Sequence, residues 1–317
     1  MVRRIVPNID NDTFIHRYQY TPDDSRTSQQ RHDKLIRELD VLQGDIVCLQ
    51  EVGEEYQPFL SSELGERGYM GEYFRKTMGT REGSATYFKK EEFELLDVQK
   101  LTFNEMLEEA LDGANIDTSV AASCARDHVF LIVKLKHLKT RKVVTIGNIH
   151  TIWDNFSQLD VTTLQAALAL AKLVRFAENS TFIMAGDFNS RQNMAPYYLL
   201  LNGKLNESHK KELTAVATMK HAGKSLFELL EDCYHHSSED LASSYLSLKG
   251  TEPDLTNYDD YDGQHPADWC LDYIWYTSAT IEANSVLDTI GTPSSRLPND
   301  VFPSDHLSLK TTFSFCK

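Results

Sequence analysis

The sequence predicts an α/β protein in which helices alternate with the strands of layered β-sheets. Apolar runs of about four to eight residues, typical of buried strands, alternate with segments whose apolar residues recur at helical spacing. This alternation continues along the whole chain of 317 residues, which favours an α/β protein over a helical bundle or an all-β sandwich. The chain has no Pro/Ser-rich linker, internal repeat or low-complexity tract, so we expect one domain over residues 1–317.

The elements of the N-terminal part follow from this periodicity. Residues 25–42 predict an amphipathic helix with Ser25 and Thr27 as candidate caps and Gly44 at its end. Residues 45–50 (DIVCLQ) predict a short strand buried on both faces. We further expect a helix over residues 57–64, strands over 85–88 and 93–98, and a helix or loop over the acidic residues 105–117.

The same patterns predict the rest of the chain. A hairpin is expected from residues 128–136 and 143–149, a long helix over 160–178 and a buried strand over 181–185. Two more strands are expected over residues 271–276 and 307–315. Residues 250–268, which are rich in Asp, Tyr, Gly and Pro, are expected to form a surface loop.

Composition excludes several classes of function. Lys and Arg number 32 against 47 Asp and Glu, so the net charge is −15. A protein that binds long nucleic acid by neutralising phosphates is expected to be basic, which disfavours non-specific duplex binding. No apolar run approaches the ~20 residues that span a bilayer, so we expect no membrane-spanning role. We expect a monomer.

Cysteine usage indicates a reducing compartment. The five cysteines are odd in number, widely spaced and without a CxxC pair: Cys48, Cys124, Cys233, Cys270 and Cys316. This argues against a disulfide framework and against a structural zinc site. The N-terminus lacks the apolar core of a signal peptide, and we expect a cytoplasmic or nuclear protein.

Polar residues collect where the expected strands begin or end. They are Asn8, Glu51, His150, Asp187, Asn189, Asp272, Asp305 and His306. Each alone has a plainer explanation: GDFN at residues 186–189 can be a simple turn, and a single histidine such as His150 is more often structural. Their joint occurrence carries the argument, because ligands gather at the strand ends of α/β sheets.

This set of side chains suits hydrolysis of phosphate esters. The carboxylates of Glu51, Asp187 and Asp305 are hard oxygen ligands, which suit Mg²⁺ or Mn²⁺ rather than zinc. A histidine beside such a cluster places a titratable acid or base next to a metal ion. Phosphate-ester hydrolysis needs both.

The order of these motifs resembles that of a known superfamily. The matching strings are DIVCLQEV (45–52), EGSATYFK (82–89), NIH (148–150), DVTTLQAA (160–167), GDFN (186–189), LDYIWY (271–276) and PSDHLS (303–308). Together they resemble the endonuclease/exonuclease/phosphatase superfamily, and within it the branch of nocturnin, Angel and the carbon-catabolite-repressor deadenylases. The resemblance implies a four-layer α/β/β/α sandwich, in which two packed mixed β-sheets are flanked by helices and the active site lies at one edge.

The resemblance also implies roles for the strand-end residues. Glu51 would hold a catalytic Mg²⁺, which Mn²⁺ could replace, with Asn8 beside it and Asp305 contributing to the metal or acid/base network. Asp187 would orient or deprotonate the attacking water. Asn189 and His150 would bind the scissile phosphate. His306 would act as the acid/base histidine, oriented by Asp272.

The first motif departs from the family pattern. Residues 7–10 read PNID where the family usually has an aromatic residue followed by Asn-Ile-Leu. Asn8 matches, and Asp10 is either an additional metal contact or a plain turn residue. Residues 154–158 and 250–268 also differ from any one branch, and both segments are expected to border the substrate.

We expect the protein to recognise only a short stretch of its substrate. The resemblance places Lys89 and Arg191 near the active-site edge, and Trp153, Phe156 and Tyr258 are either base-stacking residues or loop residues packed on the core. The predicted activity is that of a 3′-exoribonuclease acting on adenylate-containing RNA. The alternatives are a phosphatase or phosphodiesterase acting on the NADP 2′-phosphate or 2′,5′-oligoadenylate, a DNA-end phosphodiesterase, and a non-enzymatic scaffold. The complete acidic and histidine set argues against the scaffold.

Overall fold

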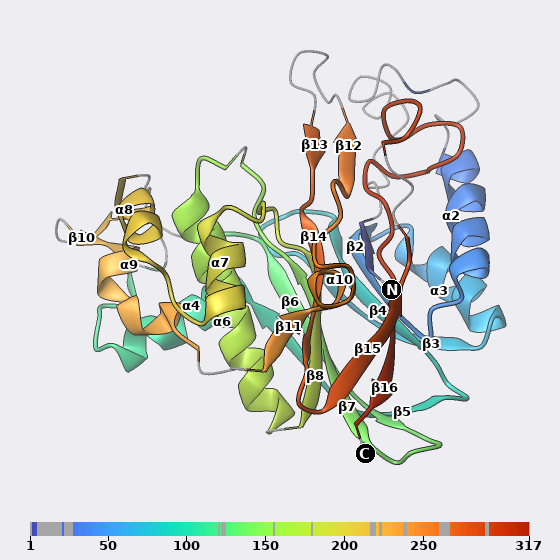
Figure 1. The fold of residues 1–317 in the computed structure, drawn as a ribbon, viewed down its shortest axis with the longest axis horizontal. Coiled ribbons are helices and arrows are strands. Elements are labelled where there is room, and N and C mark those ends of the chain that lie inside the picture. The colour runs from blue at the N-terminus through green and yellow to red at the C-terminus, as the bar shows by residue number, and fades with distance from the viewer. Residues whose placement is uncertain are drawn as a thin grey trace.

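Two mixed β-sheets pack face to face at the centre of the computed structural model (Figure 1). The structure describes residues 2–4, 21, 28–119, 121, 125–154, 156–178, 180–215, 220–221, 224–236, 240–259, 267–288 and 292–316. The smaller sheet has the order β1-β2-β4-β3, formed by β1 (Val2–Arg4), β2 (Ile46–Gly53), β4 (Glu82–Lys89) and β3 (Tyr69–Arg75). β1 is parallel to β2, and the other neighbours are antiparallel.

The larger sheet has the order β11-β14-β8-β7-β6-β5. Its strands are β11 (Leu241–Ser243), β14 (Asp272–Thr277), β8 (Thr181–Asp187), β7 (Val143–His150), β6 (Val129–His137) and β5 (Phe93–Thr102). Only the β7–β8 pairing within this sheet is parallel. This pairing brings the carboxyl ends of two central strands to one edge.

Helices cover both outer faces (Figure 1). α2 (Ser28–Leu42) and α3 (Gln57–Glu66) lie on the smaller sheet. The larger sheet is covered by α4 (Phe103–Gly113), α6 (Leu159–Ala177), α7 (Ala195–Asn202), α8 (Glu207–Ala215), α9 (Leu226–Leu229) and the 3₁₀ helix η2 (Glu231–Tyr234). A capping box at Thr102, whose hydroxyl accepts from the Glu105 amide, starts α4.

Three apolar layers separate these four layers of structure. Side chains along a strand point alternately to the two faces of its sheet. Cys48 of β2 therefore faces the larger sheet, while Val47 and Leu49 face α2 and α3. On β8, Ala185 faces the smaller sheet and Met184 faces the helices. The predicted four-layer α/β/β/α sandwich is therefore confirmed.

Small elements complete the C-terminal part. They are α10 (Ser244–Lys249) and the two-stranded pairs β9 (Lys220–His221) with β10 (Lys224–Ser225), β12 (Asn257–Asp259) with β13 (Ala267–Trp269), and β15 (Ile281–Val286) with β16 (Thr311–Phe315). The expectation that residues 250–268 form only a surface loop was wrong, because β12 and β13 form there and Leu255, Thr256 and Asn257 are buried. Backbone hydrogen bonds explain this burial: Tyr258 donates to Asp305, and Leu307 donates to Thr256.

Most expected elements form within a few residues of their predicted ends. The strand expected over residues 307–315 is shorter, since β16 begins at Thr311. Ser25 and Thr27, the candidate caps of α2, lie outside the described residues. None of the helices in the described ranges has the length and apolar character that a bilayer crossing requires.

Candidate active site

Three neighbouring strands bring three predicted site residues into one row. His150 at the end of β7 pairs in register with Asp187 at the end of the parallel strand β8. β14 is antiparallel to β8, so Asp272 at its start pairs with the same Asp187. All three side chains are buried. This edge of the larger sheet is therefore the candidate active site.

Gly186 allows β8 to approach β7 just before Asp187. Its φ of +149° is rarely adopted by residues with a side chain, and a Cβ built on it would lie 1.9 Å from the carbonyl oxygen of Ile149. No side chain can occupy that space without moving the strand. The glycine of the GDFN motif thus fixes the position of the carboxylate that follows it.

A β-bulge brings Glu51 from the smaller sheet to this row. The register between β2 and β4 shifts between Leu49 and Val52, and Glu51 has a φ of +57°. A bulge redirects the side chain that it carries. Glu51 is 6% exposed, and its Oε1 lies 3.9 Å from Nε2 of His150.

Asn148 supports this bulge from the opposite sheet. Its Nδ2 donates to the backbone oxygens of Leu49 and Ala85, at 3.2 and 2.9 Å, and lies 3.3 Å from the hydroxyl of Thr86. Its Oδ1 accepts a 2.7 Å hydrogen bond from Nε2 of Gln50. The amide is fully buried between the two sheets. The conformation of residues 50–51 therefore depends on a side chain two residues before His150.

Glu82 is a site residue that the sequence analysis did not select. Donor atoms of Glu51, Glu82 and His150 lie within 4.8 Å of one another, a spacing at which they could hold a metal ion. Glu82 also accepts a 2.7 Å hydrogen bond from the largely buried ammonium of Lys76. The sequence did carry a signal for Glu82, because this residue begins the matching string 82–89. In the structure Glu82 pairs with Gly53, just beyond the bulge.

The turn after Asp187 is held in a strained conformation. Asn189 has a φ of +44°, and its backbone N–H donates to Oδ1 of Asp187 at 2.8 Å. Its side-chain Nδ2 donates to the carbonyl of Thr151 at 2.8 Å. An amide nitrogen carries two N–H donors, so the second can meet a substrate oxygen. Backbone strain of this kind concentrates at functional sites.

His306 forms the predicted pair with Asp272. Nδ1 of His306 donates to Oδ2 of Asp272 at 2.7 Å, and both side chains are buried. Nε2 of the same ring lies 4.0 Å from Oδ2 of Asp187, and Nε2 of His150 lies 3.8 Å from that oxygen. The carboxylate of Asp187 is thus flanked by two imidazole rings.

A third histidine packs against this group. The ring of His128 meets that of His150 edge to face, with centroids 5.6 Å apart. Burial lowers the pKa of His128, which keeps this ring neutral at pH 7. It therefore adds no positive charge beside His150.

The donor set fits a divalent metal ion. Asp187, Asp272 and His306 form a second group with donor atoms within 4.8 Å, and carboxylate oxygens dominate both groups. Within the described part of the chain, the buried Oδ1 atoms of Asp272 and Asn189 have no hydrogen-bond partner. Buried acceptors without donors suit a site that a cation or a substrate completes.

Other predicted site residues lie outside these two groups. Asp305 is buried beside His306, and its Oδ1 lies 3.4 Å from the Ser304 hydroxyl, which donates to it. The placement of Lys89 was wrong: β4 is antiparallel to β2, so Lys89 lies at the opposite end from Glu51 and pairs with Asp45 at 2.9 Å. Asn8 and Asp10 lie outside the described residues.

Arg191 lies over two aromatic rings, of which Phe156 was predicted and Trp269 was not. Trp153, Phe156 and Trp269 contact one another with ring centroids 5.0 to 5.6 Å apart. The guanidinium carbon of Arg191 lies 4.7 Å from the centre of the Phe156 ring. Trp153 is 41% exposed. We call these four residues the aromatic–arginine cluster. Each lies in a segment that follows the strand end at His150 or Asp187, or that precedes the strand start at Asp272. Tyr258 instead packs under Arg296.

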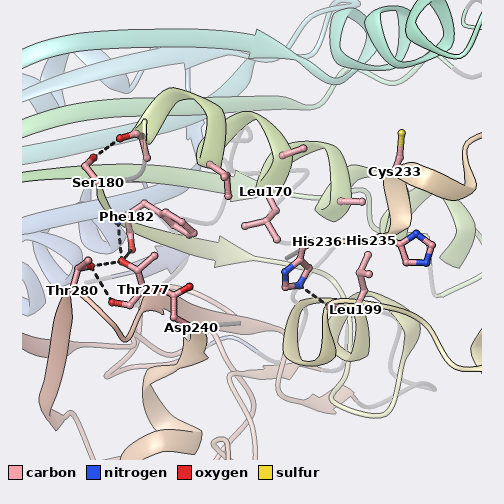
Figure 2. A pocket seen from close by; sticks show the side chains of 14 residues that line it. Leu170, Ser180, Phe182, Leu199, Cys233, His235, His236, Asp240, Thr277 and Thr280 are labelled. Atoms are coloured by element: carbon pink, nitrogen blue, oxygen red, sulfur yellow. Dashed lines mark hydrogen bonds between the residues drawn. The ribbon is translucent and has the colours of Figure 1, made fainter. Parts of the chain in front are cut away.

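A separate hollow lies on the helix-covered face of the larger sheet (Figure 2). Its volume is about 460 Å³, and α6 forms one wall. His236 donates from Nε2 to the carbonyls of Leu199 and Leu200, so this ring closes the end of α7. None of the residues lining it belongs to the metal-competent groups found among the described residues.

The fold and the site define a class of protein. The chain belongs to the Endonuclease/Exonuclease/phosphatase family, whose model matches residues 8–306. The superfamily predicted from the motifs is thereby confirmed. Enzymes of this family hydrolyse phosphoric esters and generally depend on divalent metal ions.

Among curated proteins, the chain is similar to fungal exoribonucleases. It is 26% identical to the CCR4-Not complex 3′-5′-exoribonuclease subunit Ccr4 of Aspergillus niger, over 94% of this chain and 49% of that protein. The Debaryomyces hansenii subunit of the same name is also 26% identical, over 95% and 37%. The chain therefore spans about half the length, or less, of these relatives.

Solved structures share the fold. ANGEL2, described as a 2′,3′-cyclic phosphatase and solved with adenosine-2′,3′-vanadate, has a TM-score of 0.75 at 22% identity, covering 98% of this chain and 94% of that chain. The human Nocturnin catalytic domain with a bound sulfate anion has a TM-score of 0.59 at 22% identity, covering 91% and 87%.

Proposed function

We propose that this protein is a Mg²⁺-dependent 3′-exoribonuclease of the deadenylase type. One observation carries the proposal: His150, Asp187 and Asp272 share one row, and Glu51 and His306 reach it from other segments. Five buried polar side chains from distant parts of the chain are costly to assemble without a function. The Ccr4 relatives, named as 3′-5′-exoribonucleases, support this choice of reaction.

Glu51 would hold the metal ion, with Glu82, Asp305 and Asn8 as further candidate ligands. Carboxylate oxygens favour Mg²⁺ or Mn²⁺ over softer ions, which is the basis for naming Mg²⁺. When bound, the ion neutralises charge on the phosphate and stabilises the leaving oxygen.

The remaining residues position the phosphate and move protons. Asn189 and His150 bind its non-bridging oxygens through N–H groups. Asp187, whose Oδ1 is occupied by the amide of Asn189, presents Oδ2 to orient and deprotonate the attacking water. His306 donates from Nδ1 to Asp272, so its Nε2 is the atom that takes or gives a proton on the substrate side. Positioning and electrostatics supply most of the rate enhancement in such a site.

The aromatic–arginine cluster supports recognition of a short adenylate end. Aromatic faces stack nucleobases without requiring a basic surface, which fits a net charge of −15. Arg191 supplies a cation at the same place. Lys89 is not part of this proposal.

We also propose a cytoplasmic or nuclear setting and a monomer built from one domain over residues 1–317. Among the residues that the structure describes, the thiols of Cys48, Cys233, Cys270 and Cys316 form no disulfide with one another, which supports a reducing compartment.

A parallel substrate panel tests the function. Purified protein with Mg²⁺ is incubated with 3′-oligoadenylate RNA, 2′,5′-oligoadenylate, NADP and abasic DNA, and products are identified by mass spectrometry. We expect release of 5′-AMP from the 3′ end of oligoadenylate as the fastest reaction. Faster loss of the NADP 2′-phosphate, or faster cleavage of the 2′,5′-linked oligomer, would replace the RNA substrate by a small adenine nucleotide.

A further inference from the structure

Tyr273 connects two segments that carry candidate catalytic residues. It follows Asp272 on β14 and is 1% exposed. Its hydroxyl oxygen lies 2.9 Å from the carbonyl oxygen of Ser190 and 2.9 Å from that of Cys270. Both carbonyls are acceptors, so the hydroxyl donates and shares its one proton between them.

The two carbonyls belong to the turn of Asn189 and to the approach to Asp272. Ser190 directly follows Asn189, whose left-handed backbone persists only when its surroundings enforce it. Cys270 lies just before the strand that begins at Asp272. A single hydroxyl therefore links the phosphate-binding amide to the carboxylate that orients His306.

The ring of Tyr273 is itself fixed in place. It packs edge to face on Phe188, with centroids 5.8 Å apart, and lies 5.0 Å from the ring of Tyr197. Burial raises the pKa of Tyr273 well above its ordinary value, so the hydroxyl stays protonated throughout any practical assay range. The donor is permanent.

We propose that Tyr273 is a positioning residue for phosphodiester hydrolysis, whose hydroxyl holds Asn189 and Asp272 in their mutual geometry. This inference rests on the proposed function. The hydroxyl donates to the backbone carbonyls of Ser190 and Cys270, so Tyr273 acts through the two segments that it joins. Loss of the hydroxyl leaves the Asn189 turn with its hydrogen bonds to Asp187 and Thr151 and with the bond from the Phe188 N–H to the Leu271 carbonyl.

The test replaces Tyr273 by Phe, which keeps the ring. We expect kcat on oligoadenylate to fall about tenfold, the effect of one buried hydrogen bond, while KM changes less than about twofold. Tyr234→Phe is the matched control. Tyr234 is also 1% exposed in the same apolar layer, and within the described part of the chain its hydroxyl has no hydrogen-bond partner. That variant should match the wild type.

A second control separates stability from positioning. Tyr197→Phe removes a 2.8 Å hydrogen bond to Oε1 of the buried Glu252, so it should lower the melting temperature without lowering kcat at temperatures where the protein is folded. Tyr273→Phe combined with Asn189→Ala should lose less kcat than the product of the two separate losses, because part of the effect of Tyr273 passes through Asn189. Full multiplication of the two losses would overturn the proposal.

Hydrogen exchange supplies a readout independent of activity. In Tyr273→Phe the amides of residues 187–191 should exchange about tenfold faster, with no change in Tyr234→Phe. Unchanged exchange would overturn the positioning role. A wild-type protein that hydrolyses nothing in the panel would overturn the proposed function, and the exchange rates alone would then decide whether Tyr273 holds this turn.

Discussion

Replacing Asn148 by Ala should destabilise the protein and weaken its metal site together. The amide of Asn148 fills the space beside the bulge that carries Glu51, and it is fully buried between the sheets. Its removal breaks three hydrogen bonds, those to the carbonyl oxygens of Leu49 and Ala85 and that from Nε2 of Gln50.

The magnitude follows from these three buried groups. A typical hydrogen bond contributes about 1 kcal/mol net, and a buried group left without a partner costs about 1–3 kcal/mol. Partial relaxation of the cavity gives an expected loss of about 3–5 kcal/mol in the free energy of unfolding. At about 2 °C per kcal/mol for a chain of this size, the melting temperature should fall by about 6–10 °C.

Chemical denaturation and thermal melting measure this loss, with Thr145→Val as the matched control. Thr145 is equally buried on the same strand, and its hydroxyl has no hydrogen-bond partner among the residues that the structure describes. Thr145→Val should therefore stay within about 0.5 kcal/mol of the wild type or be more stable. The apparent Mg²⁺ affinity should fall in Asn148→Ala only. A loss below about 1 kcal/mol, or equal effects of the two substitutions, would refute the supporting role.

Three further outcomes are expected. Glu51→Ala should abolish turnover and leave the melting temperature measured without Mg²⁺ nearly unchanged, because it removes a metal ligand rather than core volume. Near-normal turnover with retained stabilisation by Mg²⁺ would refute the metal assignment. His306→Ala combined with Asp272→Asn should be scarcely less active than His306→Ala alone, because paired residues lose activity non-additively; independent multiplication of the losses, measured by kcat/KM, would count against the pair. Binding of oligoadenylates to His306→Ala in Mg²⁺ should have a slope of log affinity against log salt of about −1.4 to −2.1, as for two or three phosphates, and this slope should not grow with oligomer length. A steep, length-dependent slope would show an extended electrostatic groove.

The sequence predicts those parts of the fold and site that depend on local pattern. The helix over Ser28–Leu42 and the strand that leads to Asp187 follow from apolar periodicity, which the structure confirms. Glu51, His150 and Asp187 could be selected because strand ends meet at one edge of a sheet. The structure brings these three together.

Contacts across the sheets account for what was missed. Asn148 and Tyr273 act through backbone carbonyls of segments far away in the chain, which no local pattern encodes. Lys89 was misplaced because β4 pairs antiparallel to β2. This pairing puts the start of β4 beside Glu51 and the end of β4, with Lys89, away from the site. Residues 250–268 have loop-like composition, and pairing with the segment at Asp305 buries part of them.

Metal-dependent shortening of a labelled RNA tests the central claim most directly. A 5′-labelled oligoadenylate is followed in single-turnover reactions over a Mg²⁺ titration, with EDTA as the zero point. We predict loss of one nucleotide at a time from the 3′ end, at a rate that saturates with Mg²⁺ and vanishes in EDTA. Hydrolysis of equal rate in EDTA, or labelled RNA that stays at full length at saturating Mg²⁺, would contradict the assignment of this edge as a metal-dependent phosphodiesterase site.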